Sequence, residues 1–395
     1  PNLVSSAMSS IPIAMKQEIS ALELARTVEA GEPIQVVDVR AAFRLDSGRI
    51  DLVPDSSFHN IVGSQLAKVE DLEGTGIDPQ VPVAVVCGKG SDSRILASHL
   101  NRLGCQARSL SGGMGSWMML TLERELSPTA SLDRLVQFDR IGKGALGYLL
   151  VSDSEAIAID PPRDPSAYLA AAEASDCSIV GVADTHVHAD YISGGPELSR
   201  ELQVPYYLHP DDACYPYDGR PGTIPFEPIE HGQEIAFGRS RLKIAHTPGH
   251  TDGSVSYLVD DQAAFTGDFI FIASVGRPDL AGKEQEWTLK LWESLELSRR
   301  EWSPSLRIYP AHYGSDEERQ SDRSIGAPLS ELRQTNSSLQ ETDRQAFIEW
   351  VLARKASFPD AYRKIKAVNV GLLPVSNDEA DELEVGKNEC ALGGS

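Results

Sequence analysis

Four short motifs of histidine and aspartate, each placed directly after a predicted strand, constrain this chain more than any other feature. Seven of its nine histidines fall between residues 186 and 312. The motifs are Thr185-His186-Val187-His188-Ala189-Asp190-Tyr191, His246-Thr247-Pro248-Gly249-His250-Thr251, Thr266-Gly267-Asp268 and Tyr309-Pro310-Ala311-His312. Loops that follow neighbouring strands can converge on one point. Imidazoles and carboxylates gathered in this way are what a divalent transition metal requires.

The segment that carries these motifs is dominated by short predicted strands from Leu132 onward. We predict strands over 147–152, 156–160, 178–184, 242–246, 254–259, 263–266 and 306–309, and helices over 165–174, 286–300 and within 329–355. A polar end begins near Pro374, and residues 376–395 hold six acidic residues and one lysine. We expect this end to be mobile or loosely docked.

The first segment, residues 15–128, instead alternates strand and helix patterns. Residues 34–39 and 81–86 are typical of buried strands, and apolar spacing predicts a helix over 91–104. Such alternation implies an α/β unit with a parallel sheet. The pattern breaks over 123–130, so we expect one domain at 15–125, a second at 131–373 and an acidic tail at 374–395.

A cysteine lies between the second of these strands and the helix. It begins the loop Cys87-Gly88-Lys89-Gly90-Ser91-Asp92-Ser93-Arg94. In such a loop the backbone N–H groups and the helix N-terminus favour a thiolate over a thiol, so Cys87 is a candidate nucleophile. The two glycines permit the tight path that the loop has to follow. The alternative interpretation is a buried structural cysteine before a tight turn.

Several further segments lie in the order typical of a rhodanese (sulfurtransferase) domain. They are Val37-Asp38-Val39-Arg40, Gly48-Arg49-Ile50 with Pro54, Val85-Val86-Cys87, and Leu110-Ser111-Gly112-Gly113-Met114 with Trp117. Residues 15–125 therefore resemble a rhodanese domain. The resemblance implies that Cys87 carries a sulfane sulfur as a persulfide within the loop Gly88, Lys89, Gly90, Ser91, Asp92 and Ser93. It also implies supporting roles for Asp38 and Arg40.

The loop also departs from the common rhodanese pattern. Asp92 stands where many rhodaneses have arginine, and Arg49 stands where a histidine is common. An acid beside the loop weakens an anion pocket and leaves Lys89 and Arg94 as the nearby cations. A thiol persulfide is therefore at least as good a candidate donor as thiosulfate.

The histidine motifs resemble the metallo-β-lactamase fold, an αββα sandwich, over about residues 131–320. Within that superfamily they are most similar to persulfide dioxygenases, on the four motifs above and on Gly276-Arg277-Pro278-Asp279. The later segment Tyr362–Asn369 resembles the C-terminal extension of proteins that fuse such a domain to rhodanese units. The resemblance implies that His186, His250 and Asp268 bind the metal. Two histidines and one carboxylate form the facial triad of non-haem Fe(II) oxygenases.

The number of metal ions follows from Tyr191. Dinuclear relatives such as glyoxalase II need a histidine at this place, and tyrosine is a poor ligand at neutral pH. We therefore expect one Fe(II) per chain. His188, Asp190 and His312 are expected to orient ligands or substrate through hydrogen bonds. Arg277 either pairs with Asp279 or meets a substrate carboxylate.

The resemblances together imply a bifunctional sulfur enzyme. We expect oxidation of a low-molecular-weight persulfide, glutathione persulfide first among them, by O₂ to sulfite and thiol, with sulfane-sulfur transfer at Cys87 involving sulfite or thiosulfate. Coenzyme A and bacillithiol persulfides stay open as substrates, and so does homo-oligomerisation. The alternatives are a dinuclear thioester hydrolase similar to glyoxalase II and a non-catalytic sulfur carrier.

Composition excludes some partners and indicates a compartment. A net charge of −22, from 36 Lys+Arg and 58 Asp+Glu, argues against nucleic acid as a partner. No apolar run reaches the roughly 18 residues of a membrane span. Five widely spaced cysteines are no disulfide framework, so we expect a reducing, cytoplasmic location. Residues 1–12 lack a secretory pattern, although the remnant of a removed leader stays open.

The sequence indicates no chemical role for the other cysteines. Cys105, Cys177 and Cys214 are expected to serve packing. Cys390 lies in the acidic end and is compatible with an exposed thiol.

Overall fold

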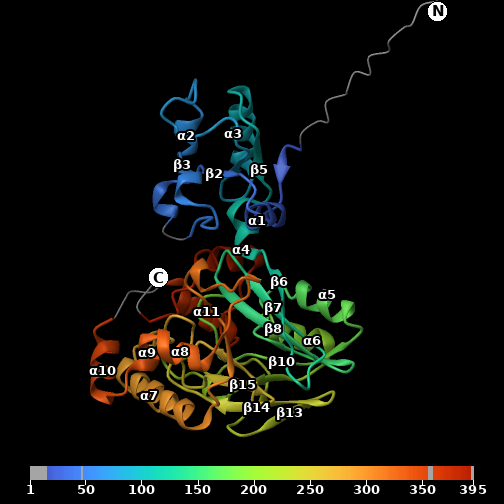
Figure 1. Ribbon diagram of the computed structural model, residues 1–395, viewed down its shortest axis with the longest axis vertical. Coiled ribbons are helices and arrows are strands. Elements are labelled where there is room, and N and C mark those ends of the chain that lie inside the picture. Colours follow the sequence, from blue (N-terminus) through green and yellow to red (C-terminus); the bar gives the residue numbers. More distant parts are fainter. Residues whose placement is uncertain (1–15, 46–47, 355–358, 393–395) are drawn as a thin grey trace, which may run out of the picture. The chain divides into compact units, whose positions relative to one another are not determined.

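A computed structural model describes residues 16–45, 48–354 and 359–392 (Figure 1). It divides into two compact units, residues 1–117 and 118–395, which are described separately below. Residues 1–15 lie outside the described residues, and with them the expectations on the N-terminus and on the start of the first domain at residue 15. The predicted boundaries at 125, 131 and 373 stay predictions.

The first unit is built on one five-stranded sheet in which every pairing is parallel, with the order β1-β5-β4-β2-β3. Its strands are β1 (Glu18–Ile19), β2 (Gln35–Asp38), β3 (Phe58–Asn60), β4 (Val83–Val86) and β5 (Ala107–Leu110). Its helices are α1 (Ala21–Glu29), α2 (Gly63–Leu66), α3 (Ser91–Arg102) and α4 (Gly113–Met119), the last of which crosses the boundary between the units. The predicted parallel α/β sheet is confirmed. Strands β2 and β4 are buried along their whole length, as expected of central parallel strands.

The second unit contains two larger mixed sheets. The first has the order β12-β11-β10-β9-β8-β7-β6 and the second has the order β13-β14-β15-β16-β17-β18. The first sheet consists of β6 (Leu122–Leu126), β7 (Arg134–Arg140), β8 (Ala145–Ser152), β9 (Glu155–Ile159), β10 (Ser178–Ala183), β11 (Tyr206–Leu208) and β12 (Glu227–Pro228). The second consists of β13 (Glu234–Phe237), β14 (Ser240–His246), β15 (Val255–Val259), β16 (Ala263–Gly267), β17 (Arg307–Pro310) and β18 (Ala327–Pro328).

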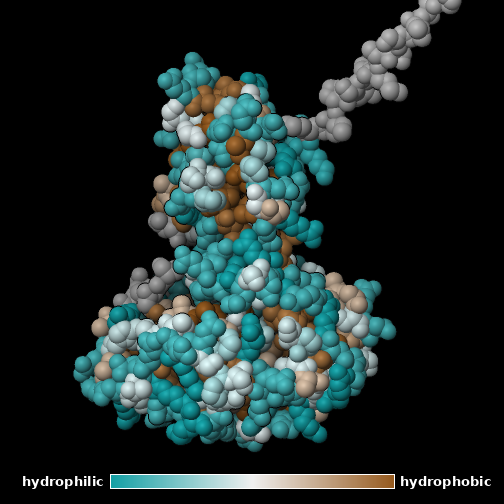
Figure 2. All heavy atoms as spheres, in the orientation of Figure 1, coloured by the Kyte–Doolittle hydropathy of each residue, from teal (hydrophilic) through white to brown (hydrophobic). Residues whose placement is uncertain are grey.

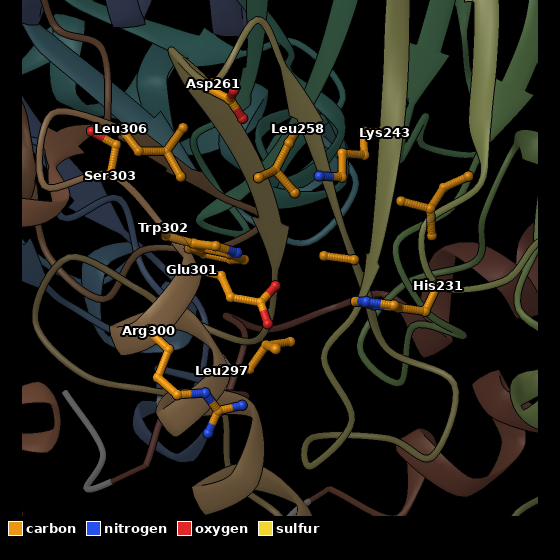
Figure 3. Close-up of a pocket in the computed structure, with 12 residues that line it drawn as sticks. His231, Lys243, Leu258, Asp261, Leu297, Arg300, Glu301, Trp302, Ser303 and Leu306 are labelled. Atoms are coloured by element: carbon orange, nitrogen blue, oxygen red, sulfur yellow. The ribbon is translucent and has the colours of Figure 1, made fainter.

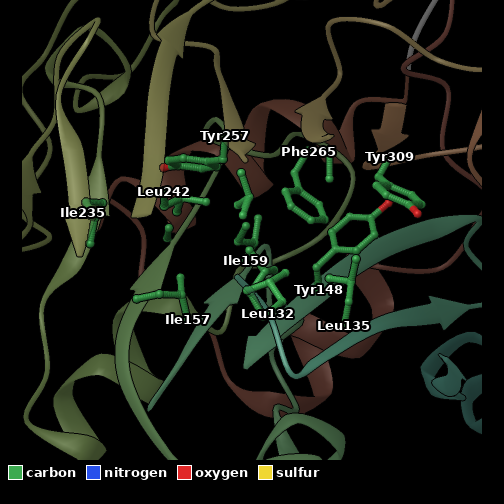
Figure 4. Packing of buried hydrophobic residues seen from close by; sticks show 14 of the residues in the cluster. Leu132, Leu135, Tyr148, Ile157, Ile159, Ile235, Leu242, Tyr257, Phe265 and Tyr309 are labelled. Atoms are coloured by element: carbon green, nitrogen blue, oxygen red, sulfur yellow. The ribbon is translucent and has the colours of Figure 1, made fainter. Parts of the chain in front are cut away.

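The core of this unit lies between the two sheets (Figure 4). Tyr148 of β8 and Ile159 of β9 share one hydrophobic cluster with Tyr257 of β15 and Phe265 of β16. The rings of Tyr148 and Phe265 lie 4.7 Å apart between centroids. Burying these large side chains on facing strands is the main force that holds one sheet against the other.

Helices cover the outer face of each sheet, which completes the predicted αββα sandwich. Helices α5 (Ser166–Ala174) and α6 (Gly195–Leu202) pack on the first sheet through a cluster that includes Tyr168 and Leu198. The second sheet is covered by α7 (Glu284–Glu301), α8 (Leu329–Thr335), α9 (Ser337–Gln340) and α10 (Arg344–Leu352). On α7, Trp287, Leu291 and Leu295 recur at four-residue spacing and are all buried.

The C-terminal end differs from the sequence expectation. Helices α11 (Ala361–Asn369) and α12 (Asn377–Leu383) are followed by residues 384–392, which we call the C-terminal strap. Glu384 and Cys390 of the strap are buried, at 1% and 0% exposure, so the idea of an exposed thiol at Cys390 was wrong. The pattern of polar residues concealed this, because the strap docks through specific hydrogen bonds and one buried ion pair rather than through an apolar stripe.

Hydrophilic residues dominate the face of the second unit that Figure 2 shows. Among the described residues, no helix has the length and apolar character that crossing a bilayer demands.

Gly147 offers a test of the packing between β8 and α5. A Cβ at this position would collide with the Tyr168 hydroxyl and would lie 2.6 Å from the carbonyl oxygen of Asp160. We expect Gly147→Ala to lower the free energy of unfolding by roughly 2–4 kcal/mol, since close-packed backbone has to shift. Urea unfolding measures this, with Leu169→Ala on the surface of α5 as the control. Equal stability of the two variants would contradict the packing described.

Candidate metal centre and cysteine loop

Three of the predicted residues meet at one end of the second unit. His186 follows β10, His250 follows β14 and Asp268 follows β16. Asp268 Oδ2 lies 3.5 Å from His186 Nε2 and 3.3 Å from His250 Nε2. All three side chains are buried. We call them the metal triad.

The chemistry of the triad fits a metal ion. His186 Nε2, His250 Nε2 and Asp268 Oδ2 are buried and have no hydrogen-bond partner in the described part of the chain. Three unpaired polar atoms that face one another would be costly in a protein interior. Ligands at about 2.0–2.2 Å from one ion stand roughly 3.0–3.5 Å from each other, which matches the observed separations.

Hydrogen bonds orient both histidines for this role. His250 Nδ1 donates to the carbonyl oxygen of Arg277 at 3.0 Å, which leaves the Nε2 lone pair facing Asp268. His186 Nδ1 lies 3.0 Å from the hydroxyl of Thr185, which in turn donates to Asp160. Burial lowers the pKa of His250 to about 4 and holds the pKa of His186 well below its usual range. Both rings are therefore neutral near pH 7, as metal ligands have to be.

Two glycines allow the loops to approach so closely. Gly249, just before His250, has φ +144°, and a Cβ there would lie 2.5 Å from Leu291 of α7. Gly267, just before Asp268, has φ +53°, in the left-handed region that glycine favours. The backbone conformation therefore requires glycine directly before His250 and directly before Asp268.

His312 holds the other side of the Asp268 carboxylate. Its Nδ1 lies 2.6 Å from Asp268 Oδ1 and its Nε2 lies 3.1 Å from Asp190 Oδ2. Burial opposes the charged ring, but the two carboxylates outweigh it and raise the pKa of His312 to about 10. An imidazolium between two carboxylates fixes the rotamer of Asp268; that His312 and Asp190 orient the site in catalysis stays a prediction.

His188 and Tyr191 form a separate polar cluster. The Tyr191 hydroxyl lies 2.9 Å from His188 Nε2, and that nitrogen lies 3.1 Å from Asp160 Oδ1. Burial and the nearby carboxylates hold the pKa of Tyr191 well above its usual range, so no phenolate forms there. Tyr191 is therefore a protonated hydrogen-bonding residue in this structure.

Of the two roles considered for Arg277, the structure contains the ion pair with Asp279. Its guanidinium meets Asp279 at 2.6 and 2.7 Å, and the side chain is only 4% exposed. Its carbonyl oxygen also accepts the hydrogen bond from His250. Arg277 thus supports a metal ligand through its backbone while its side chain anchors the loop.

Sequence reasoning missed three buried groups beside the triad. Lys143 and Lys366 are each 1% exposed and interact electrostatically with Asp190, and Cys390 interacts with both Asp190 and Asp268. Lys366 lies in the segment 362–369 that the family resemblance had marked, so a signal existed. No local pattern marks Lys143 or Cys390, because only the fold brings them to the site.

The cysteine loop of the first unit has the expected construction. Cys87 is 4% exposed, its sulfur accepts a hydrogen bond from the Gly90 amide at 3.1 Å, and it lies 3.2 Å from the Ser93 hydroxyl. Burial alone would raise the pKa of Cys87. Hydrogen bonds from the Ser93 hydroxyl and from the amides of Ser93, Gly90 and Asp92 outweigh burial and lower that pKa.

The first residues of α4 pack against this loop and hydrogen-bond to it. The amide of Met114 donates to the carbonyl oxygen of Cys87 at 2.9 Å. Gly113 has φ +60°, and a Cβ there would collide with the same carbonyl. The Gly112-Gly113 pair is therefore needed for a close backbone contact with the loop, and the loop backbone is held rigidly around the sulfur.

The charged residues near the loop are arranged differently from the expectation. Arg94 pairs with Glu18 at 2.5 Å, so it was wrong to count Arg94 as a cation left to attract an anion. Lys89 is exposed. Asp38 accepts from Arg40, whose guanidinium also donates to the carbonyl oxygen of Gly48 at 2.8 Å, in agreement with a supporting role for this pair.

Two cavities of the second unit are candidates for a route by which a ligand could reach the triad. The larger, of about 530 Å³, lies between β14, β15 and the end of α7 and contains no residue of the triad (Figure 3). The smaller, of about 220 Å³, is lined by His312 and by Asn388, Ala391 and Leu392 of the strap. Neither cavity is lined by a triad residue, but the smaller one is lined by His312, which is bonded to Asp268, and by residues of the strap.

Comparison with known proteins agrees with both units. Residues 143–321 match the Metallo-beta-lactamase superfamily and residues 20–120 match the Rhodanese-like domain. The chain joins a rhodanese-like domain to a metallo-beta-lactamase domain. A metallo-beta-lactamase from Staphylococcus aureus subsp. aureus COL has a similar structure, with a TM-score of 0.53 and 26% identity, over 65% of this chain and 74% of that one.

Curated relatives of the metallo-beta-lactamase domain differ in their described chemistry. Persulfide dioxygenase ETHE1, mitochondrial, of Homo sapiens is 32% identical over 165 residues, which is 40% of this chain and 59% of that protein. Probable polyketide biosynthesis zinc-dependent hydrolase PksB of Bacillus subtilis (strain 168) is 26% identical over 196 residues, which is 49% of this chain and 80% of that protein. The family thus establishes a metal-binding enzyme fold without selecting the reaction.

The triad predicts where metal binds. We expect His250→Ala to lower the metal content of purified protein to roughly a tenth of the wild-type value, because one ligand is lost. Elemental analysis measures this. A second group, formed by His209, Asp211 and His246, also gathers donor atoms, so His209→Ala serves as the control. Metal lost from the control and kept in His250→Ala would place the ion at that second group.

The Cys87 loop predicts a pH profile for alkylation. Because its pKa is lowered, Cys87 should react with iodoacetamide at lower pH than an ordinary cysteine, whose pKa is about 8.5. Ser93→Ala removes one hydrogen bond to the sulfur and should shift the midpoint upward. Ser98→Ala, at an exposed position of the same helix, should leave it unchanged. An unshifted midpoint in Ser93→Ala would contradict the described role of the hydroxyl.

Proposed function

We propose that this protein oxidises a low-molecular-weight persulfide, glutathione persulfide first among them, by O₂ at Fe(II) bound to the metal triad, with one iron per chain. The overall reaction is RSS⁻ + O₂ + H₂O → RSH + SO₃²⁻ + H⁺. We further propose that Cys87 of the rhodanese-like domain transfers sulfane sulfur between a persulfide and sulfite or thiosulfate.

The observation that carries the proposal is the ligand set. Two neutral imidazoles and one carboxylate, His186, His250 and Asp268, present their unpaired atoms from one side, and this combination suits Fe(II) with positions left for substrate and O₂. Iron bound there would supply the one-electron chemistry that O₂ requires. The described similarity to a persulfide dioxygenase supports the same reaction.

A single iron is supported by what lies next to the triad. Tyr191 is protonated and bonded to His188, and His312 is an imidazolium held by Asp190 and Asp268. Both nitrogens of His312 are therefore engaged. A second ion at that position would have to displace a proton and break two charge-assisted hydrogen bonds.

The protein's own groups have identifiable tasks in such a reaction. Arg277 and Thr185 fix the tautomers of the two histidines through hydrogen bonds to Nδ1. His312 keeps Asp268 turned toward the triad. Lys143 and Lys366 place two buried amines near Asp190. Burial lowers the pKa of both amines and the nearby carboxylates oppose that shift; in their protonated forms they would favour an anionic sulfur.

Sulfur transfer at Cys87 balances without an external oxidant. The Cys87 thiolate attacks the outer sulfur of a persulfide, which releases the carrier thiolate and leaves Cys87–S–S⁻. Sulfite then attacks that outer sulfur, thiosulfate leaves and the Cys87 thiolate returns. The three amides and the Ser93 hydroxyl that lower the pKa of Cys87 would stabilise the anion in both forms.

The two activities can be tested with one pair of variants. Iron-loaded protein should consume O₂ and form sulfite with glutathione persulfide, and His250→Ala should lose at least about 100-fold of this activity. Cys87→Ser should keep O₂ consumption and lose thiosulfate formation, because its site lies in the other domain. An oxygen electrode measures O₂ consumption, and ion chromatography measures the sulfite and thiosulfate formed.

Two results would contradict the proposal in different ways. Protein that holds two zinc ions, consumes no O₂ and cleaves S-lactoylglutathione would be a hydrolase, as the described similarity to a zinc-dependent hydrolase allows. Protein that carries an added sulfur on Cys87 and turns over at neither site would be a sulfur carrier.

A further inference from the structure

The C-terminal strap delivers one side chain to the metal centre. Cys390 has 0% exposure, and its sulfur lies within 4.8 Å of a carboxylate oxygen of Asp190 and a ring nitrogen of His312. Its thiol also interacts with Asp268, a member of the triad. The cysteine thus lies near Asp268 of the triad and also near Asp190 and His312.

The strap is held in place by bonds on both sides of Cys390. Before it, the buried Glu384 pairs with Arg140 at 2.5 Å, and the Asn388 amide donates to the carbonyl oxygens of Lys143 and Gly144 at 3.1 and 3.2 Å. After it, the amide of Leu392 donates to the carbonyl oxygen of Val275 at 2.8 Å. Contacts of Glu384, Asn388 and Leu392 with the rest of the domain therefore fix where the sulfur lies.

The backbone of Cys390 is tied to the metal ligands as well. Its carbonyl oxygen accepts from the amide of Arg277 at 2.9 Å, and the carbonyl oxygen of Arg277 orients His250. The next strap residue, Ala391, forms a β-bridge with Gly276. The strap and the loop that supports His250 are thus one hydrogen-bonded structure, so the position of the sulfur is coupled to that of the triad.

The polar surroundings of the sulfur indicate more than packing. Apolar residues lie on one side of Cys390, among them Phe271 and Leu280. Asp190 and Asp268, which both interact with Cys390, each keep one buried oxygen, Oδ1 and Oδ2, without a hydrogen-bond partner among residues 16–45, 48–354 and 359–392. A cysteine that only packs would not be expected near two carboxylates that each keep an unpaired oxygen, because a buried unpaired carboxylate oxygen favours a nearby cation.

We propose that Cys390 gives its sulfur to the metal bound by His186, His250 and Asp268, so that the C-terminal strap caps this centre in its resting state. Binding a cation converts the thiol to a thiolate and releases one proton to solvent. Thiolate is a soft ligand that Fe(II), Co(II) and Zn(II) all accept.

For turnover this assignment rests on the function proposed above. The capping sulfur occupies the kind of position that the sulfur of a persulfide would take, so substrate has to displace it. The cavity lined by His312 and the strap residues Asn388, Ala391 and Leu392 is the approach that such a displacement would open further. The Cys390 thiolate would thereby occupy one coordination position of the metal until the sulfur of a substrate displaces it.

The test uses full-length protein loaded with Co(II) in the absence of O₂ and persulfide. Co(II) bound to a thiolate shows a sulfur-to-metal charge-transfer band in the near ultraviolet, which nitrogen and oxygen ligands do not give. We expect this band in the wild type, its loss in Cys390→Ser, and its retention in Cys177→Ser, a half-buried cysteine of the same domain. Cobalt should remain bound in Cys390→Ser and leave to a chelator about tenfold faster.

A second measurement covers the case in which Cys390→Ser fails to fold. X-ray absorption of the wild-type protein loaded with Zn(II) should then show one sulfur neighbour at about 2.3 Å. Asn388→Ala, which loosens the strap and keeps the cysteine, should weaken the charge-transfer band.

Three outcomes would overturn the assignment: no charge-transfer band in the wild type, a band that persists in Cys390→Ser, or two cobalt ions per chain. The last would place the sulfur on an ion of its own with Asp190 and His312. None of these readouts involves O₂ or persulfide. Failure of the dioxygenase proposal would therefore leave this test unaffected, and the reverse also holds.

Discussion

The carboxylate of Asp268 is the group on which the site depends. One oxygen faces the Nε2 atoms of His186 and His250 at 3.5 and 3.3 Å, and the other is bonded to His312 at 2.6 Å. A buried anion is costly unless it is neutralised from every side. The second unit satisfies this demand with an imidazolium on one side and a cation-binding triad on the other. The loops after β10, β14 and β16 have to converge for that reason.

The net charge of −22 sets a second constraint, because the proposed ligands persulfide, sulfite and thiosulfate are all anions. Local groups have to offset the long-range field. Of the cations that sequence reasoning assigned to this task, Arg94 pairs with Glu18 and Arg277 pairs with Asp279. The groups that remain are the loop amides around Cys87 and, in the other domain, the amines of Lys143 and Lys366, whose pKa burial lowers.

Much of the architecture could be predicted because its signals are local. The strand before Cys87, the helix after it and the strands that precede the four histidine motifs all appear within a few residues of their expected bounds. Each depends on apolar periodicity and on glycine at turns, which short windows of sequence contain. The strap could not be predicted in this way, since Glu384 and Asn388 dock by pairing with Arg140 and with backbone carbonyls more than two hundred residues earlier.

The sequence by itself determined which residue types are available for chemistry: a cysteine in a glycine-rich loop, and histidines and aspartates directly after strands. It also excluded a histidine at position 191. Only the tertiary structure decided which of these donors lie together, which nitrogen of each ring is unpaired, and that Cys390 lies beside Asp190 and His312. The physical reason is that hydrogen-bond partners and burial are properties of the packed chain. An unpaired Nε2 or a buried thiol has no signature until distant segments enclose it.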